Sequence, residues 1–324
     1  MVTVDHVNLT DERSYDEFYA VYRSSHDRDF EVPSRRNGKR VEFAFPGNYY
    51  KISAVIARDT SGRPIAVGSL QLPLADNLEL AYVTIEVRPE RRREGFGSAV
   101  LHEFLVLARA AGRSRAFAEA RWGLLDDPAV PRLFLESHGF LLDLLDAQRD
   151  VKLPAKLPEA PLDPAYRLAS WRGECPRKLV DSYARLRSLM VQEAPSGDIG
   201  FEPEVWDGDR VRHEEQTWVK QGRDTQVTVA IGPDGSLAGH TQIVVPRDDL
   251  ETAYQWDTLV LPAHRGRGLG LALKVHNHHA AADRLNGRRR VTTENAASND
   301  HMIAINRLMG YRHVAHIGEF MRDL

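Results

Sequence analysis

The chain has 324 residues, of which 42% are hydrophobic and 27% charged, so length and composition favour two globular domains that each bury a core. The net charge of −3 argues against a nucleic-acid partner, and the single cysteine, Cys175, excludes an intramolecular disulfide or a site of several thiolates. No apolar stretch approaches the roughly 18 residues of a membrane helix, and residues 1–10 lack signal-peptide features, so we expect a cytoplasmic protein without a membrane partner.

The first half predicts helices and strands in mixed order. A helical segment over residues 11–24 is followed by a strand hairpin that turns at residues 59–62. A β-branched and aromatic run at residues 82–87 predicts a strand, and apolar residues at helical spacing follow over residues 100–108. A short strand at residues 114–120, a second helix and a closing strand complete this half.

Residues 152–164 separate the two halves. Their four prolines remove backbone donors and disfavour both helix and sheet, which is typical of a semi-extended linker. We therefore expect an N-terminal domain over residues 1–153, a linker over residues 154–165 and a C-terminal domain over residues 166–324.

The second half repeats the same order of elements. It predicts a helix over residues 176–192, a hairpin turn at residues 233–236, a strand over residues 254–260, a helix from residue 269 and a strand over residues 288–293. Strands mixed with helices, occurring twice, predict an α/β or α+β fold class.

A shared motif supports the repeat. Both halves contain the pattern V-x-P-x-x-R-x-x-G-x-G, over residues 87–97 and again over residues 260–270. Each half also has a later glycine–aromatic pair, Gly139-Phe140 in the first and Gly310-Tyr311 in the second. Two copies at nearly constant separation indicate a duplicated domain.

The motif places a glycine-rich turn between a strand and a helix. The first N–H groups of a helix lack internal acceptors and carry a partial positive charge, so such a turn can bind a pyrophosphate. A dinucleotide-binding turn would need G-x-G-x-x-G, and a P-loop would end in Gly-Lys-Ser/Thr; neither is present. A turn with merely solvated arginines is the remaining alternative, and two copies in matching contexts argue against it.

At these two motifs the chain resembles the GCN5-related N-acetyltransferases, the GNAT superfamily, whose signature is R/Q-x-x-G-x-G/A after a strand ending in V-x-P. The two-domain layout is similar to that of tandem members such as mycothiol synthase. The resemblance implies mixed, mostly antiparallel sheets flanked by helices, and acetyl-CoA as cosubstrate with its pyrophosphate on the loop amides. It assigns cofactor binding to Leu259, Val260, Arg265, Gly266, Arg267, Gly268, Leu269 and Gly270, and in the first half to Val87, Arg92, Arg93, Gly95, Phe96 and Gly97.

A second family motif distinguishes the halves. It runs from an asparagine that contacts the cofactor, through seven residues to a tyrosine that protonates the thiolate, to the glycine–aromatic pair. Counting back from that pair gives Asn299 and Asn306 in the second half, but Pro128 and Leu135 in the first. We therefore expect a degenerate N-terminal domain and a catalytic C-terminal one, with Asn299 and Asn306 at the cofactor; helix capping is the alternative role for Asn299.

Acetyl transfer needs a neutral amine, a polarised thioester carbonyl and a proton for the departing thiolate. The carboxylate that several family members use as base would fall at Tyr254, so the base is expected to be Asp257 or Glu294 instead. Since Asn306 is no acid at neutral pH, the thiolate proton is expected from Tyr254, Tyr311 or water.

The resemblance thus implies an N-acetyltransferase that moves an acetyl group from acetyl-CoA to a primary amine of a small molecule, in a ternary complex. The alternatives are a non-catalytic acyl-CoA-binding or regulatory protein, and a protein lysine acetyltransferase. Either a monomer or a homodimer is compatible with the sequence.

Two other groups of residues carry weaker signals. Trp206 and Trp218 could line an amine pocket or simply pack in a core. His276, His278 and His279 lack a third metal ligand at a recognisable spacing, so we expect a solvated helix face and no metal.

Overall fold

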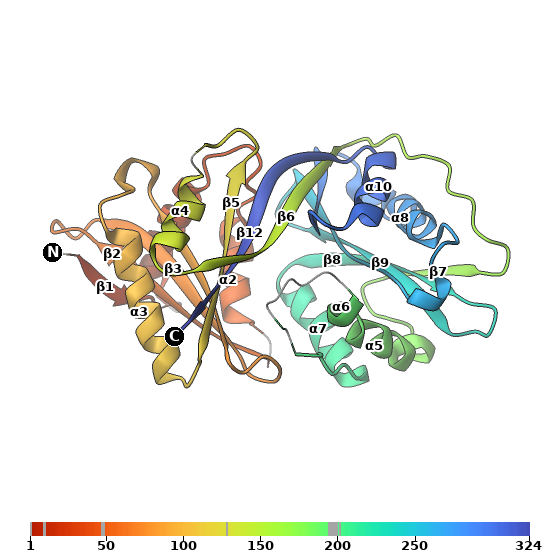
Figure 1. Ribbon diagram of the computed structural model, residues 1–324, viewed down its shortest axis with the longest axis horizontal. Helices are drawn as coiled ribbons and strands as arrows, with labels where there is room; N and C mark the ends of the chain where they lie inside the picture. The colour runs from red at the N-terminus through yellow and green to blue at the C-terminus, as the bar shows by residue number, and fades with distance from the viewer. Residues whose placement is uncertain (1, 9–10, 47–48, 128, 194–199, 201) are drawn as a thin grey trace. The chain divides into compact units, whose positions relative to one another are not determined.

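The computed structural model describes residues 2–8, 11–46, 49–127, 129–193, 200 and 202–324. The chain forms two compact units: unit 1 comprises Met1–Leu144 and Ile317–Leu324, and unit 2 comprises Leu145–His316. Each unit contains a mixed β-sheet with helices packed on it (Figure 1).

Unit 1 has a sheet in the order β1-β2-β3-β4-β5-β12. Strands β1 to β4 pair antiparallel, and β4 and β5 pair parallel. The elements are β1 (Thr3–His6), α1 (Glu12–Ser25), α2 (Arg36–Ala44), β2 (Tyr50–Arg58), β3 (Pro64–Pro73), β4 (Leu80–Val87), a 3-10 turn η1 (Pro89–Arg91), α3 (Phe96–Ala110), β5 (Arg115–Gly123), α4 (Val130–Ser137), the start of β6 (Leu141–Lys152) and the end of β12 (Arg312–Asp323).

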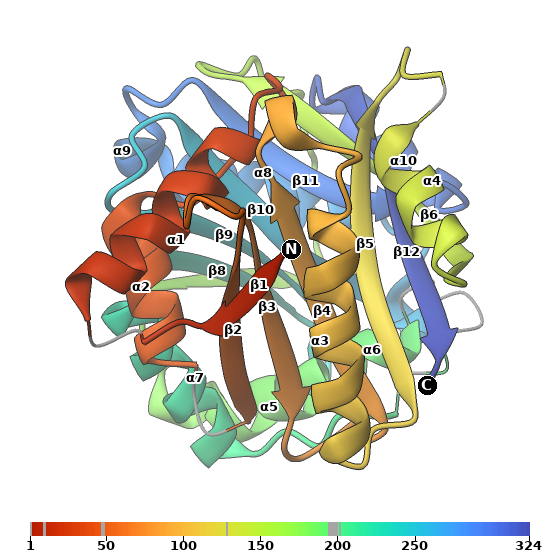
Figure 2. The ribbon, with the colours of Figure 1, turned by 90° about the vertical axis from the view of Figure 1, so that its left-hand side faces the viewer.

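The helices of unit 1 cover both faces of its sheet. Helices α1 and α2 share an apolar cluster with Val67 of β3, whereas the next residue, Gly68, faces Val100 and Phe104 of α3. Because successive strand residues point to opposite faces, α1 and α3 lie on opposite sides of the sheet. Figure 2 shows α3 running along the strands of this unit.

Unit 2 has a sheet in the order β6-β11-β10-β9-β8-β7. Its elements are the end of β6, then β7 (Arg167–Arg172), η2 (Arg177–Leu179), α5 (Val180–Ser188), α6 (Met190–Glu193), α7 (Gly208–Lys220), β8 (Arg223–Ile231), β9 (Leu237–Pro246), β10 (Thr252–Val260), η3 (Pro262–His264), α8 (Leu269–Ala280), α9 (Ala282–Leu285), β11 (Arg290–Ala296) and α10 (Asp300–Leu308), followed by the start of β12. Helices α5 and α7 cover one face of the sheet, and α8 and α10 cover the other (Figure 1).

Each unit contains one strand from the opposite end of the sequence: β6 lies largely in unit 2, and the end of β12 lies in unit 1. Strand β6, formed before the proline-rich segment, pairs antiparallel with β11 over Asp146–Lys152 and so belongs largely to unit 2. The C-terminal strand β12 lies next to β5 in unit 1. The proline-rich residues themselves lack regular structure, and Leu157 and Ala160 pack on the core of unit 2. The division at residues 154–165 therefore stays a prediction about the sequence repeat, since the compact units do not follow it.

Most of the expected elements are present. The helix over residues 11–24 corresponds to α1, both hairpin turns join antiparallel strands, and the strands at residues 82–87 and 254–260 are β4 and β10. The expected helix over residues 176–192 is instead divided into η2, α5 and α6.

Candidate functional site

The glycine-rich turn of unit 2 has the backbone shape of an anion site. Gly266 and Gly268 have φ of 77° and 71°, and α8 begins directly afterwards at Leu269. No side chain of the described residues caps this helix, so its first N–H groups are open to a ligand. A Cβ on Gly270 would lie 2.9 Å from Cδ1 of Ile305, so the last glycine of the motif allows α8 to approach α10.

Unit 1 repeats this turn with one difference. Gly95 has φ of 88° and precedes α3 as Gly268 precedes α8, but the position of Gly266 is taken by Arg93, with φ of 68°. A non-glycine residue in the left-handed region is disfavoured by about 1–2 kcal/mol. The turns of the two units therefore share the same backbone conformation, although Arg93 does not favour it.

Arg93→Gly should raise the free energy of unfolding by about 1 kcal/mol, because glycine adopts this conformation without the steric cost. Urea unfolding would measure it. The matched control, Gly266→Arg in unit 2, should lower stability by a similar amount. A loss of stability in Arg93→Gly would contradict the shared conformation.

The motif arginines brace their turns. Nε of Arg265 donates to the carbonyl of Val260 at 3.0 Å, and Nε of Arg92 donates to the carbonyl of Val87 at 3.3 Å. Arg265 also pairs with Glu193 of α6 at 2.5 Å. In both units the guanidinium thus ties the turn back to the end of the preceding strand.

A cavity opens beside the turn of unit 2. Strands β10 and β11 pair only over Thr252–Tyr254 and Arg290–Thr292, and the cavity, of about 670 Å³, lies where they separate. It is lined by Asp146, Met190, Glu193, Tyr254, Gln255, Trp256, Asp257, Thr258, Leu259, Val260, Arg265, Gly270, Lys274, Thr292, Thr293, Glu294, Asn295, Ala296, Asn299, His301, Met302 and Ile305.

A β-bulge shapes the wall of this cavity. The pairing of β10 with β9 shifts between Gln255 and Thr258, which leaves one extra residue around Trp256 and Asp257. The buried amide of Gln255 donates to the carbonyl of Gln242 at 2.9 Å and stabilises the bulge from inside. The bulge frees backbone groups of β10 next to the cavity.

Asp257, one of the two expected bases, lines the cavity and is held by a buried cation. Its Oδ2 lies 3.8 Å from Nε of Arg187, which also donates to Glu214 at 3.1 Å and lies 4.1 Å from the ring centroid of Trp206. Burial raises the pKa of Glu214, while Arg187 opposes that rise. Arg187 therefore connects the cavity wall to the core beneath α5 and α7.

Two other residues expected to take part in catalysis, Glu294 and Tyr254, also line the cavity. Glu294 is exposed on β11, and Tyr254 stands on β10 at the point where the two strands part. Tyr311 does not line it: it is buried, and its hydroxyl lies 3.1 Å from Nε2 of His278.

The two asparagines of the second motif occupy different places. Asn299 lines the cavity, and its side chain accepts from the N–H of Met302 at 3.1 Å, so it also caps α10. Asn306 is 0% exposed and lies behind the lining, where its side chain joins Lys274 to Asn295. It thus links two lining residues, and its expected contact with the cofactor stays a prediction.

Lys274 also lines the cavity and is not among the site residues expected from the sequence. It lies on α8 one turn after Gly270, and its Nζ donates to Oδ1 of Asn306 at 2.6 Å. Burial lowers the pKa of Lys274 to about 7. A lysine among the mostly apolar residues 269–275 of this helix was the available signal.

The expected solvated face is wrong for His278, which is buried, whereas His276 and His279 are exposed. Trp206 and Trp218 are buried and do not line the cavity, whereas the tryptophan Trp256 does. Among the described residues, no group of three histidine, cysteine, aspartate or glutamate side chains could hold a metal ion. None of the helices within the described ranges has the length and apolarity to cross a membrane.

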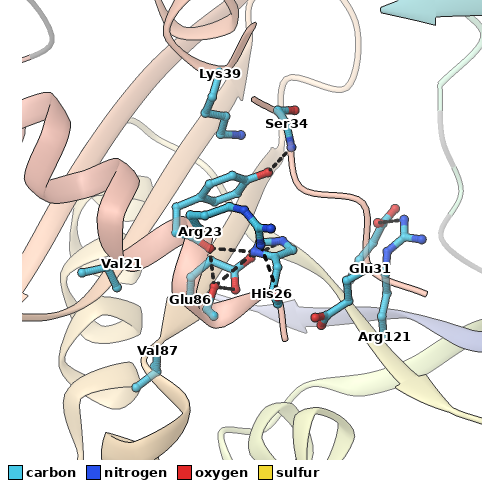
Figure 3. Close-up of polar contacts among 12 residues, drawn as sticks. Val21, Arg23, His26, Glu31, Ser34, Lys39, Glu86, Val87 and Arg121 are labelled. Atoms are coloured by element: carbon cyan, nitrogen blue, oxygen red, sulfur yellow. Dashed lines mark hydrogen bonds and ion pairs between the residues drawn. The ribbon is translucent and has the colours of Figure 1, made fainter. Parts of the chain in front are cut away.

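In unit 1, the end of β4 corresponds to the end of β10 in unit 2, and side chains of unit 1 itself make contacts there. Glu86, which precedes Val87 of the motif, accepts from Ser25 Oγ at 2.8 Å and lies 3.6 Å from Nε2 of His26 (Figure 3). Its β4 pairs with β3 without a register shift, in contrast to β10. Leu135 is buried, and Pro128 lies outside the described residues.

The comparisons with known families and with solved structures both point to GNAT proteins. Residues 187–311, within unit 2, match the family described as "Acetyltransferase (GNAT) family". A search of curated proteins finds no match.

Among solved structures, the chain is similar to a "Tandem GNAT protein from the clavulanic acid biosynthesis pathway", with 22% identity, a TM-score of 0.83, and coverage of 100% of this chain and 98% of that chain. A GCN5-related N-acetyltransferase from Sphaerobacter thermophilus is 14% identical, with a TM-score of 0.67 and coverage of 99% and 95%. A glucosamine N-acetyltransferase region of a fungal multi-domain β-N-acetylglucosaminidase is 16% identical, with a TM-score of 0.70 and coverage of 99% and 38%. At these identities the similarity shows the fold.

Proposed function

Because this chain is a tandem GNAT-type protein, with the expected mixed sheets flanked by helices, we propose that unit 2 moves an acetyl group from acetyl-CoA to a primary amine of a small molecule. The observation that carries the proposal is the cavity between β10 and β11, which adjoins an uncapped helix start at a glycine turn. The first provides space for a thioester and an amine, and the second provides amides for a pyrophosphate.

The residues around the cavity fit this cofactor. The N–H groups from Gly266 to Gly270 would hold the pyrophosphate, and the bulged edge of β10 at Leu259 and Val260 would pair with the pantetheine. A backbone N–H near Val260 would polarise the thioester carbonyl. Asp257 or Glu294 would accept the proton that the amine loses, and direct attack needs both substrates bound together.

Unit 1 is proposed to bind no cofactor. Glu86, Ser25 and His26 occupy the strand end with their own contacts, and the arginine on the turn, Arg91, pairs with both Asp59 and Glu94. The turn would then serve the stability of unit 1 alone.

A matched pair of substitutions tests which turn binds. Gly268→Ala and Gly95→Ala impose the same strain at the start of α8 and α3, and an added Cβ meets nothing within 4 Å at either site. We expect Gly268→Ala to weaken acetyl-CoA binding about tenfold, because about 1–2 kcal/mol of strain displaces the amides. Gly95→Ala should leave the affinity unchanged, and calorimetry would measure both.

Calorimetry of the unaltered protein should give one site for acetyl-CoA, and CoA thiol should be released with amines of small molecules. Binding without thiol release on any amine would favour the non-catalytic alternative, and release only with lysine in peptides would favour protein acetylation. Absence of any affinity for CoA would refute the proposal.

A further inference from the structure

We propose that Lys274 is the acid that protonates the thiolate when the acyl group leaves its thioester in the cavity of unit 2. The inference rests on the proposed function and deepens it, because neither the glycine turn nor the two carboxylates supplies this proton.

The position of Lys274 is unusual for a lysine. Its side chain is 1% exposed, yet it lines the cavity together with Gly270 of the turn and Asn295 of β11. A protonated Nζ has three N–H donors, and one is used by Asn306. Among the described residues, Nζ has no other hydrogen-bond acceptor, so two donors are available to a bound molecule.

Among the described residues, no carboxylate pairs with Lys274. The ring of Tyr311 lies 5.3 Å from Nζ, His278 lies one turn further along α8, and Asn306 faces Nζ from α10. The acidic and phenolic groups on the other walls of the cavity are Asp146, Glu193, Asp257, Glu294 and Tyr254. In the part of the chain that the structure describes, none of these carboxylates forms an ion pair with Lys274.

Burial is the cause that lowers the pKa of Lys274 to about 7, so the ammonium and the amine are both populated near neutral pH. A group with a pKa near the working pH is the most effective proton donor. The amide of Asn306 orients Nζ through a neutral hydrogen bond, which leaves that pKa governed by burial.

The step balances as follows. The amine nitrogen attacks the thioester carbon and forms the C–N bond, and the carbon–sulfur bond breaks with its electron pair on sulfur. The amine nitrogen gives its proton to a cavity carboxylate or water, and Lys274 gives a proton from Nζ to sulfur, which yields the free thiol. The carboxylate then releases its proton to solvent and Nζ takes one up from solvent, so no oxidant or further reactant is needed.

The first test uses CoA alone and needs no acceptor. In the complex of the protein with CoA, a cationic Nζ should stabilise the thiolate, so the bound thiol should ionise at a pH lower by roughly 1 unit or more than in Lys274→Gln. The ultraviolet absorbance of the thiolate measures this titration. Equal titration in the two proteins, each saturated with CoA, would overturn the inference.

The second test measures the reaction. Lys274→Gln should lower kcat roughly 10²- to 10⁴-fold with little change in the KM for acetyl-CoA, and the fall of kcat with rising pH near 7 should disappear. Lys178→Gln, the same change at an exposed lysine of unit 2, should leave kcat unchanged. Thermal unfolding and CoA calorimetry show whether Lys274→Gln is folded.

A change of leaving group separates an acid from a structural residue. With an acetyl thioester of an arylthiol, whose thiolate needs no protonation to leave, the defect of Lys274→Gln should shrink at least about tenfold. A defect of equal size with both donors would contradict the inference. If the unaltered protein binds CoA but acetylates no amine, the proposed function fails, while the thiol titration still decides the role of Lys274.

Discussion

Exchanging the two candidate bases of the cavity for amides, Asp257→Asn with Glu294→Gln, should lower kcat for amine acetylation by roughly 10²- to 10⁴-fold. The amide side chains keep the shape of the cavity but cannot accept the proton that the attacking nitrogen must lose. Both residues line the cavity at the place where β10 and β11 separate. Steady-state release of CoA thiol at a saturating amine concentration measures the effect.

The single variants assign the role. If Asp257 is the base, Asp257→Asn alone should reproduce the loss and Glu294→Gln should not, and the reverse pattern would assign Glu294. Asp283→Asn on α9 is the control, because its side chain is exposed and pairs only with Arg284 among the described residues. Full activity in the double variant would show that neither carboxylate is the base.

Arg187→Met should lower the free energy of unfolding by about 3–5 kcal/mol, the usual loss when one partner of a buried ion pair is removed. The side chain of Arg187 is 11% exposed and pairs with both Glu214 and Asp257. Removing the guanidinium leaves two carboxylates without their cation. Urea unfolding at neutral pH measures the loss, and Arg185→Met, exposed on the same helix, should cost less than about 0.5 kcal/mol.

The decrease in the free energy of unfolding caused by Arg187→Met should become larger as pH rises. The pKa of Glu214 is already raised by burial, and Arg187 lowers it, so the variant raises it further. When the folded-state pKa of a carboxyl group lies above its unfolded value, the folded state binds the proton more tightly. The protonated group then stabilises the folded state at low pH, and this stabilisation is lost as pH rises. Unfolding at pH 5 and pH 8 should therefore show a larger loss at pH 8. A loss independent of pH would exclude Glu214 as the cause.

The sequence predicts those parts of the fold that depend on neighbouring residues. The strand, glycine turn and helix of each half are present at residues 82–108 and 254–280, because their pattern of apolar residues and glycines acts locally. The left-handed φ of Arg93 follows instead from the repeat, since its own side chain disfavours it. Helix α2 carries few apolar residues and was missed.

The sequence predicts some residues of the candidate site and not others, and the difference has a physical reason. Residues of the motif, such as Val260 and Gly270, and the carboxylate Asp257 could be placed because their positions follow from register along one strand and one turn. Asn306 was placed by counting, but whether it faces a cavity depends on the packing of α10 against α8. Lys274 could be found only once that packing was known.

The sequence by itself determined that the chain is a repeat, that each half carries a strand–glycine-turn–helix motif, and that the second half keeps polar residues that the first has lost. These properties depend on residue identity and spacing along a short segment. Only the tertiary structure decided that β6 and β12 exchange places along the chain, that β10 bulges beside a cavity, and that a buried lysine lines it. These features arise from contacts between residues far apart in sequence, and local patterns contain no information about such contacts.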